Sequence, residues 1–385
     1  MTLNKIRNFH HHRTMSIVVT LLLLFLLTSC LSQSAPTQLA SIKPTPTPTP
    51  ALRSLARGIS IGTAVRADPL QTDLQYRNTL AREFNMLTPE NAMKFAAIHP
   101  GRNTYTFADA DTIVAFAQAH NMQVRGHNLV WYKTIPSWVT KGNFSRTDLV
   151  TILREHIMAV VSHYRNSVNI WDVVNEAIDD NGALRDSIWL HVIGPNYIDL
   201  AFRWAHQANP QAHLFYNDYG GEGLGHKSDA IYTLVKGLLQ RGIPISGVGL
   251  QMHVSLKTSP KPQDVLTNMK RLTALGLEVQ ITEMDVAIQG DPRPMEEKFA
   301  AQAQIYRDML SVCLSVRNCT AFVMWGFTDR YSWIPLATGH PDAPLIFDGE
   351  YRAKPAYYGL VDVLSESLHK KVVKGTFVGP PAPER

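Results

Sequence analysis

The sequence predicts a single large domain with the fold of a (β/α)8 barrel, in which parallel strands close into a ring inside a layer of helices. Short apolar runs rich in β-branched residues recur between residues 58 and 329, and amphipathic stretches with helical spacing separate them. Polar side chains gather at the end of nearly every run. An open doubly wound sheet is the competing arrangement, but no Gly-rich dinucleotide or phosphate loop follows the first run.

Eight runs are the expected strands, and three clear amphipathic stretches lie between them. The helical stretches are YRNTLAREF (76–84), ADTIVAFAQAH (110–120) and LVTILREHIMAVVSHY (149–164). At an average spacing of about 38 residues, eight units fill roughly 310 residues, which fits a barrel with some long loops. The expected strands are GISIGTAV (58–65), FNMLTPEN (84–91), MQVRGHNLVW (122–131), VNIWDVVNEA (168–177), AHLFYNDYG (212–220), ISGVGLQMHV (245–254), LEVQITEMDV (277–286) and TAFVMWGFTD (320–329).

Residues 1–30 resemble an export signal. A basic segment precedes an apolar run from Ile17 to Leu27, which is too short to span a bilayer comfortably. The run ends in LTSC at Cys30, which resembles a bacterial lipobox, so we expect Cys30 to be lipidated and to become the mature N-terminus. Ordinary cleavage after a small residue is the alternative. We therefore expect an exported lipoprotein on the outer face of the membrane.

A Pro/Thr-rich linker at residues 31–53 follows, because KPTPTPTP cannot form a helix or a strand ladder. We expect the barrel domain at residues 54–368 and a flexible tail at 369–385. The net charge of +5 comes largely from the two ends of the chain, and residues 31–385 carry 34 basic against 32 acidic residues. A near-neutral domain lacks the clustered basic face that nucleic-acid binding needs.

Cys313 and Cys319 are the two remaining cysteines of the exported chain. Oxidising surroundings favour a local disulfide over a metal site, since two thiolates are too few for structural zinc. Two free buried thiols are the alternative. We expect no metal ion, no cofactor and a monomer.

Glu176 and Glu283 stand out among the strand-end residues, because each follows an apolar run where barrel enzymes place their active sites. Either glutamate alone fits a solvated loop acid or an ion pair. Two carboxylates at one barrel mouth, with tryptophans nearby, suit glycoside hydrolysis, in which one protonates the leaving oxygen and the other attacks carbon or activates water.

The sequence resembles glycoside hydrolase family 10, a barrel family dominated by endo-1,4-β-xylanases. The resemblance runs in order from about residue 55 to 365. The motifs that carry it are TPENAMK (88–94), RGHNLVW (125–131), WDVVNEA (171–177), NDYG (217–220), GVGLQMH (247–253), ITEMDV (281–286) and WGFTDRYSWI (325–334).

The resemblance implies a retaining endo-1,4-β-xylanase that acts by double displacement, with Glu176 as the acid/base and Glu283 as the nucleophile. The two carboxyl groups should then lie ~5–5.5 Å apart. His253 and Asp285 match a pair that orients the nucleophile, although a lone His is usually a core residue. The implied sugar contacts are Glu90, Asn91, Lys94, His127, Trp131, Asn175, Gln251, Trp325 and Trp333. We expect Trp171 to pack in the core, and Asn217 and Asp218 either position the acid or close a turn.

The sequence departs from the family pattern at a few positions. Tyr132-Lys133-Thr134 replaces a common His-x-Gln, Phe95 a frequent Trp, and Gly220 a frequent Asn. Thr134 cannot reproduce a glutamine's paired amide contacts, so sugar binding near it is in doubt. Two alternatives stay open: the same machinery acting on another β-glycan, and a tethered polysaccharide-binding protein that has lost catalysis. The presence of both glutamates argues against the second.

Overall fold

The computed structural model describes residues 49–375, with side chains described to residue 369. The predicted signal sequence, the lipidation site Cys30 and most of the predicted linker lie outside these residues. Within residues 49–375, no helix combines the length and the apolar character that a membrane span requires.

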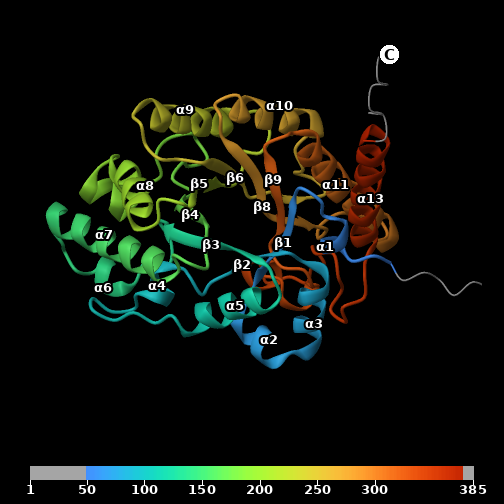
Figure 1. The fold of residues 1–385 in the computed structure, drawn as a ribbon, viewed down its shortest axis with the longest axis horizontal. Coiled ribbons are helices and arrows are strands. Elements are labelled where there is room, and N and C mark those ends of the chain that lie inside the picture. The colour runs from blue at the N-terminus through green and yellow to red at the C-terminus, as the bar shows by residue number, and fades with distance from the viewer. Residues whose placement is uncertain (1–48, 376–385) are drawn as a thin grey trace, which may run out of the picture. The chain divides into compact units, whose positions relative to one another are not determined.

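Nine parallel strands form the barrel at the centre of the domain (Figure 1). β1 pairs with both β2 and β9, and β6 pairs with β8, so eight strands close into a ring while the short β7 pairs with β8 beyond the end of β6. The predicted fold class is confirmed. The strands are β1 (Ser60–Val65), β2 (Met86–Pro89), β3 (Gln123–Val130), β4 (Ile170–Asn175), β5 (His213–Asp218), β6 (Gly247–Leu250), β7 (His253–Ser255), β8 (Glu278–Ala287) and β9 (Cys319–Met324).

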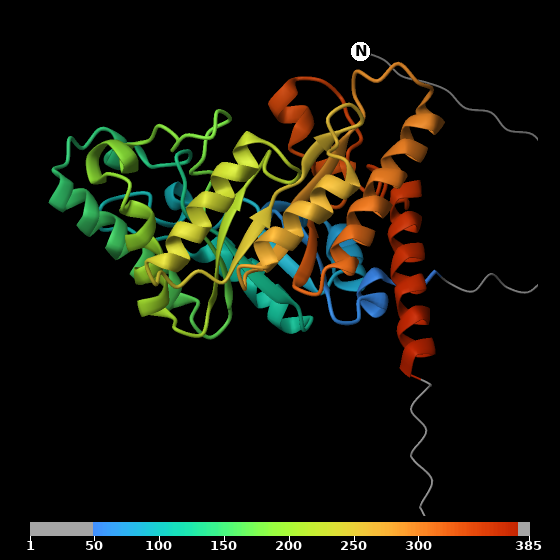
Figure 2. The same cartoon turned by 90° about the horizontal axis from the view of Figure 1, so that it is seen from above.

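Helices surround the strands, and the long pair α11 and α13 lies side by side in both views (Figures 1 and 2). The predicted helices at 76–84, 110–120 and 149–164 correspond to α3, α5 and α7. The helices are α1 (Leu52–Leu55), α2 (Ala67–Thr72), α3 (Leu74–Glu83), α4 (Phe95–Ile98), α5 (Ala108–Ala119), α6 (Ser137–Thr140), α7 (Arg146–His163), the π-helix η1 (Trp189–Ile193), α8 (Tyr197–Ala208), α9 (His226–Gln240), α10 (Pro262–Thr273), α11 (Met295–Ser315), the 3-10 turn η2 (Asp329–Tyr331), α12 (Ile334–Thr338) and α13 (Pro355–Gly375).

The strands are buried on both faces, which explains their nearly continuous apolar character. Trp171 on β4 is fully buried and lies over Gly126, its neighbour on β3, where any Cβ would come within 2.2 Å of the indole. The prediction that Trp171 packs in the core is confirmed. Gly126 therefore provides the space for the largest side chain of the barrel wall.

The predicted strand at 245–254 is interrupted in the structure. β6 ends at Leu250 and β7 begins at His253, because Met252 adopts a left-handed backbone with a φ of 68°. The amide of Met252 donates to Oε1 of the buried Glu222, at 3.0 Å, in place of a ladder bond. This break separates Gln251 from His253 at the mouth of the barrel.

Both ends of the domain differ from the predicted boundaries. Helix α1 begins at Leu52, and the Leu52 amide donates to Glu83, which also accepts from the hydroxyl of Tyr357 on α13. These contacts join residues before 54 to the domain. At the other end, α13 continues to Gly375, so residues 369–375 are helical where we expected flexible tail. No Gly or Pro interrupts the sequence between Gly359 and Gly375.

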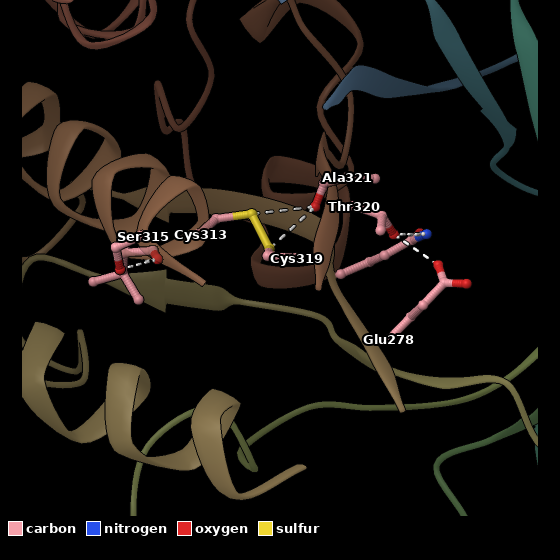
Figure 3. Close-up of a disulfide and its surroundings, with 8 residues drawn as sticks. Glu278, Cys313, Ser315, Cys319, Thr320 and Ala321 are labelled. Carbon is pink, nitrogen blue, oxygen red and sulfur yellow. Dashed lines mark hydrogen bonds between the residues drawn. A yellow bond between two sulfur atoms is a disulfide. The ribbon is translucent and has the colours of Figure 1, made fainter. Parts of the chain in front are cut away.

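Cys313 and Cys319 form a disulfide, as predicted, between the last turn of α11 and the first residue of β9 (Figure 3). Both sulfur atoms are buried beside the Ala321 carbonyl group. The disulfide lies at the N-terminal end of β9, which is the end of the barrel opposite the C-terminal ends of the strands.

Candidate active site

A cavity of about 400 Å³ opens at the C-terminal ends of the strands, and we call it the mouth cavity. It contains every predicted catalytic and sugar-contacting residue, and of the orienting pair it contains His253. Asp285 lies behind His253. Lys133 and Tyr219 also line the cavity and were not predicted. The predicted residues in its wall are Glu90, Asn91, Lys94, His127, Trp131, Asn175, Glu176, Gln251, His253, Glu283, Trp325 and Trp333.

Glu283 lies in the middle of β8 with both carboxylate oxygens held. The Nδ2 group of Asn217 donates to Oε1 at 2.6 Å, and Nε2 of His253 lies 3.1 Å from Oε2. Gly249 on β6 leaves room for this arrangement, because a Cβ there would lie 2.1 Å from the Asn217 side-chain oxygen. The carboxylate is 4% exposed and has little freedom to turn.

Burial alone would raise the pKa of Glu283. The neighbouring His127 and the hydrogen bond from His253 outweigh burial and hold this pKa below its ordinary value. Burial opposes the charged form of His253, but the charges and hydrogen bonds of Asp285 and Glu283 raise the pKa of His253 well above its ordinary value. The pair is therefore an imidazolium beside an ionised carboxylate at neutral pH.

Asp285 holds His253 from behind. These two residues are paired in the register of β7 and β8, and His253 Nδ1 lies 2.9 Å from Asp285 Oδ2. The same oxygen accepts the indole N–H of Trp333 at 2.8 Å. One carboxylate thus orients both the imidazole and an aromatic wall of the mouth cavity.

Glu176 is the first residue after β4 and has a φ of 54°, in the left-handed region that non-glycine residues seldom adopt. Its amide donates to the Asn217 carbonyl at 2.8 Å. Its Oε1 accepts from Asn175 Nδ2 at 3.2 Å and from Gln251 Nε2 at 3.1 Å. Among the described residues, no hydrogen bond reaches Oε2, so this oxygen is free to face a ligand.

The sequence left two roles open for Asn217 and Asp218, positioning the acid or closing a turn, and each residue fits a different one. Asn217 contacts Glu283 on β8 and also donates to Oδ1 of Asn175, the last residue of β4 and the neighbour of Glu176, at 2.8 Å. Asp218 accepts from the Tyr219 amide in the turn and, at 3.4 Å, from the Ile178 amide in the loop after Glu176. Burial raises the pKa of Asp218 to about 7, although Lys227 and the hydroxyl of Tyr216 oppose this rise.

His127 is held by a buried network that sequence reasoning missed. Its Nδ1 lies 2.9 Å from Asp172 Oδ2, and the fully buried Arg125 forks onto the same carboxylate. Arg125 also donates to Gln280 Oε1 at 2.5 Å. A charged residue within an otherwise apolar strand is the signal that could have identified Arg125 in RGHNLVW and Asp172 in WDVVNEA.

Lys94 and the aromatic side chains form the remaining walls. Lys94 Nζ donates to Asn91 Oδ1 at 2.8 Å, and Asn91 donates to Glu90 Oε1 at 3.1 Å. The ammonium group lies 5.1 Å from the ring centre of Trp131 and 6.0 Å from that of Trp325. Flat rings beside fixed polar groups suit a pyranose, which has apolar faces and a polar rim.

The departures from the family pattern lie in different places. Lys133 points its ammonium group toward the rings of Trp131 and Tyr132, and it lines the mouth cavity where Thr134 does not. Phe95 is a core residue stacked on His156 at 3.7 Å, outside the cavity wall. Gly220 has a φ of 67°, which suits glycine.

Comparison with known proteins gives one family. The Glycosyl hydrolase family 10 pattern matches residues 52–363. Endo-1,4-beta-xylanase B of Thermotoga neapolitana is 42% identical over 300 residues, which are 77% of this chain and 85% of that protein. The crystal structure of native xylanase 10B from Thermotoga maritima superposes with a TM-score of 0.81 at 40% identity, covering 83% of this chain and 99% of that one. Xylanase 10B from Thermotoga petrophila RKU-1, solved in complex with xylobiose, gives 0.80 at 40% identity, covering 83% and 98%.

Proposed function

We propose that this chain, which belongs to glycosyl hydrolase family 10, hydrolyses internal β-1,4-xylosidic bonds of xylan with retention of anomeric configuration. The observation that supports the proposal most directly is the different surroundings of Glu176 and Glu283. Both oxygens of Glu283 are held by donors, whereas Oε2 of Glu176, a residue that lines the mouth cavity, receives no hydrogen bond from the described residues. The first arrangement suits a nucleophile and the second suits a proton donor.

In the first step, the ionised Glu283 attacks the anomeric carbon while Glu176 gives its proton to the departing glycosidic oxygen. The bond from carbon to that oxygen breaks, and a glycosyl ester of Glu283 forms. The imidazolium of His253 favours the ionised state of Glu283 before attack. Asn217 steadies the other oxygen, so the carboxylate is aligned before substrate arrives.

In the second step, Glu176 removes a proton from water, and the water oxygen attacks the same carbon from the opposite face to the ester. The ester bond to Glu283 breaks and the carboxylate is regenerated. Two inversions give net retention. Asn175 is adjacent to the reacting centre, and we assign it the sugar 2-hydroxyl, a contact that strengthens as positive charge develops.

The sugar on the non-reducing side of the cut is assigned to Lys94, His127 and Gln251. The next sugar outward is assigned to Glu90 and Asn91. Their support is the shared cavity wall, with Trp131, Trp325 and Trp333 available to cover apolar sugar faces. Xylobiose is the ligand of the T. petrophila relative, and a xylo-oligosaccharide of this kind is the ligand we assign to the mouth cavity.

The test compares polysaccharides that differ in the sugar. The domain beginning at residue 49 is incubated with xylan, β-1,4-glucan and mannan, and new reducing ends are counted, with Glu283→Gln as the matched inactive control. Release of short oligosaccharides from xylan, with β-configured product at early times by NMR, is expected. Preferred cleavage of another β-glycan would replace the substrate assignment, and binding without cleavage would replace the enzymatic one.

We also propose that the chain is exported and held at the outer face of the membrane by lipid on Cys30. The support is the basic segment, the apolar run and the LTSC sequence, followed by a Pro/Thr-rich spacer. We propose that the anchored domain acts as a monomer, which light scattering of the domain beginning at residue 49 tests.

A further inference from the structure

The backbone of Glu176 requires support from its surroundings. Glu176 has a left-handed backbone, which is strained for a non-glycine residue and persists where neighbouring contacts enforce it. Strand β4 ends one residue earlier, at Asn175, and the chain then leaves the sheet in a loop that returns through a bridge between Ile178 and Leu184. Something in this loop must fix the direction in which the Glu176 carboxyl points.

Arg185 supplies the contacts that meet this requirement. Its Nε donates to the carbonyl of Glu176 at 2.8 Å, and its Nη2 donates to the carbonyl of Ile178 at 2.9 Å. Its own backbone amide donates to the carbonyl of Ala177 at 2.7 Å. Three consecutive carbonyls, beginning with that of Glu176, are therefore held by one residue nine positions further along the chain.

The guanidinium group is itself held in place. Nη2 also donates to the Tyr219 hydroxyl at 3.0 Å, and the group lies 4.7 Å from the ring centre of Tyr132 and 5.6 Å from that of Tyr219. The Arg185 side chain is 14% exposed. A planar fork that donates in several fixed directions while stacking on rings is a geometry that lysine cannot reproduce.

A second cation fixes the far side of the loop. The ammonium group of Lys227, in the first turn of α9, lies 3.2 Å from Asp180 in the loop and 3.1 Å from Asp218 at the end of β5. It also lies 3.4 Å from the ring centre of Tyr219. The loop after Glu176 is thus attached to β5 on one side and to Arg185 on the other.

We propose that Arg185 is a positioning residue for the acid/base Glu176, holding its carbonyl so that Oε2 faces the leaving oxygen of the substrate. This inference rests on the proposed function of Glu176. Arg185 acts through Glu176 and does not enter the reaction itself. Its loss should therefore impair the proton transfer more than the attack by Glu283, whose contacts come from other residues.

The experiment uses three aryl β-xylobiosides of similar size, with 2,4-dinitrophenyl, 4-nitrophenyl and phenyl leaving groups. Their kcat/KM values report the first chemical step, and the need for protonation rises along this series. The kcat/KM of Arg185→Met should fall about 10- to 100-fold on the phenyl glycoside and less than about threefold on the dinitrophenyl glycoside. Azide should raise its kcat on the dinitrophenyl substrate, because the water-activating step also uses Glu176.

Arg53→Met is the matched control, because Arg53 also donates to two carbonyls, those of Ala81 and His120, at 2.7 and 2.9 Å. This variant should lower the melting temperature without changing the dependence on the leaving group. Arg185→Lys, which keeps the charge and loses the fork, should fall between Arg185→Met and wild type. If Arg185→Met does not yield folded protein, the proposal is tested with Arg185→Lys. The quantity compared is again the loss of kcat/KM on the phenyl glycoside relative to the loss on the dinitrophenyl glycoside.

Equal losses on all three glycosides would overturn the inference and leave Arg185 a structural residue. Wild-type protein that cleaves none of the three would instead overturn the proposed function. The two failures are therefore distinguishable. Guanidinium ion at millimolar concentration, added to Arg185→Ala, should restore activity on the phenyl glycoside selectively.

Discussion

Nε2 of His253 lies 3.1 Å from Oε2 of Glu283, and the two groups keep each other charged inside the mouth cavity. Burial disfavours both charges, but His253 has its pKa raised well above the usual range and Glu283 has its pKa lowered. The ionised state of Glu283 therefore depends on His127 and on the hydrogen bond from His253, which is itself held by Asp285.

Replacing His253 should move the acid limb of the pH–rate profile. Glu283 must be ionised to attack, and without the imidazolium its pKa should rise, so activity should disappear at a higher pH on acidification. His253→Ala should also lose about 10- to 100-fold in kcat/KM at the optimum, the effect of a missing hydrogen bond to a charged group. The dinitrophenyl xylobioside is the substrate, because it isolates the nucleophile. His213→Ala, at an exposed His–Glu278 pair at the other end of the barrel, is the control. An unchanged acid limb in His253→Ala would contradict this account of the pair.

Acidification should destabilise the domain through His156. This side chain is fully buried against Phe95, and neither ring nitrogen has a hydrogen-bond partner of normal geometry among the described residues. Burial, with a smaller contribution from His99, lowers its pKa well below the ordinary value. The contribution of neutral His156 to the free energy of unfolding is fully present above about pH 6.5. It is lost as the pH falls below this value, because the unfolded chain then binds a proton that the folded chain does not.

Urea unfolding at pH 7 and pH 5.5 measures this effect. His156→Phe keeps a flat ring and removes the titration, so its free energy of unfolding should fall less over this interval, by up to about 1.4 kcal/mol per pH unit. His206→Gln, at an exposed histidine on α8, should retain the wild-type dependence. Equal slopes for wild type and His156→Phe would refute the assignment.

Removing the disulfide should lower stability without affecting catalysis. Cys313 and Cys319 are six residues apart, so the bond closes a small loop, and its chain-entropy contribution is roughly 2–3 kcal/mol. The double Cys→Ala variant should unfold at lower urea concentration and keep the wild-type kcat/KM on xylan oligosaccharides, since the bond lies at the opposite end of β9 from the site. Thiol titration of unfolded, unreduced wild type should find neither cysteine free.

Lipid attachment at Cys30 is tested by mass analysis of the exported protein after growth with labelled fatty acid. A diacylated Cys30 at the N-terminus is expected, and Cys30→Ala should release active enzyme from the membrane. A mature N-terminus at another residue, without lipid, would contradict the proposed anchor. That outcome would leave the proposed activity of the domain untouched.

Much of the fold was predictable because each strand–helix unit carries its own apolar periodicity. The break at Met252 was not predictable, because it depends on an acceptor, Glu222, thirty residues away in sequence. The meeting of Glu176 and Glu283 at one face followed from barrel geometry, since parallel strands bring their C-terminal ends together. Glu176 follows the last residue of β4 as expected, whereas Glu283 lies inside β8, which continues to Ala287.

The supporting residues of the site could not be read in the same way. Arg185 lies in a polar loop, and its role appears only when its guanidinium group reaches back to the Glu176 carbonyl. Arg125 and Asp172 stand out as polar residues within apolar strands, but their pairing joins residues 47 positions apart and is seen only in the folded chain. Lys133 occupies the cavity wall at a departure where sequence reasoning examined Thr134 instead.

The roles of the two glutamates are tested most directly by the products that azide forms with Glu176→Ala and Glu283→Ala on the dinitrophenyl xylobioside. Glu176→Ala should form the glycosyl-enzyme from this substrate at most of the wild-type rate, because the dinitrophenolate leaves without a proton. Its rate of xylan cleavage should fall about 10²- to 10⁴-fold. Its glycosyl-enzyme should accumulate, and azide should release it as the β-glycosyl azide. Glu283→Ala should lose activity on xylan and on the dinitrophenyl xylobioside alike. With azide it should give the α-glycosyl azide by direct displacement. Identical products from the two variants, or inversion by the wild type, would show that these roles are wrongly assigned.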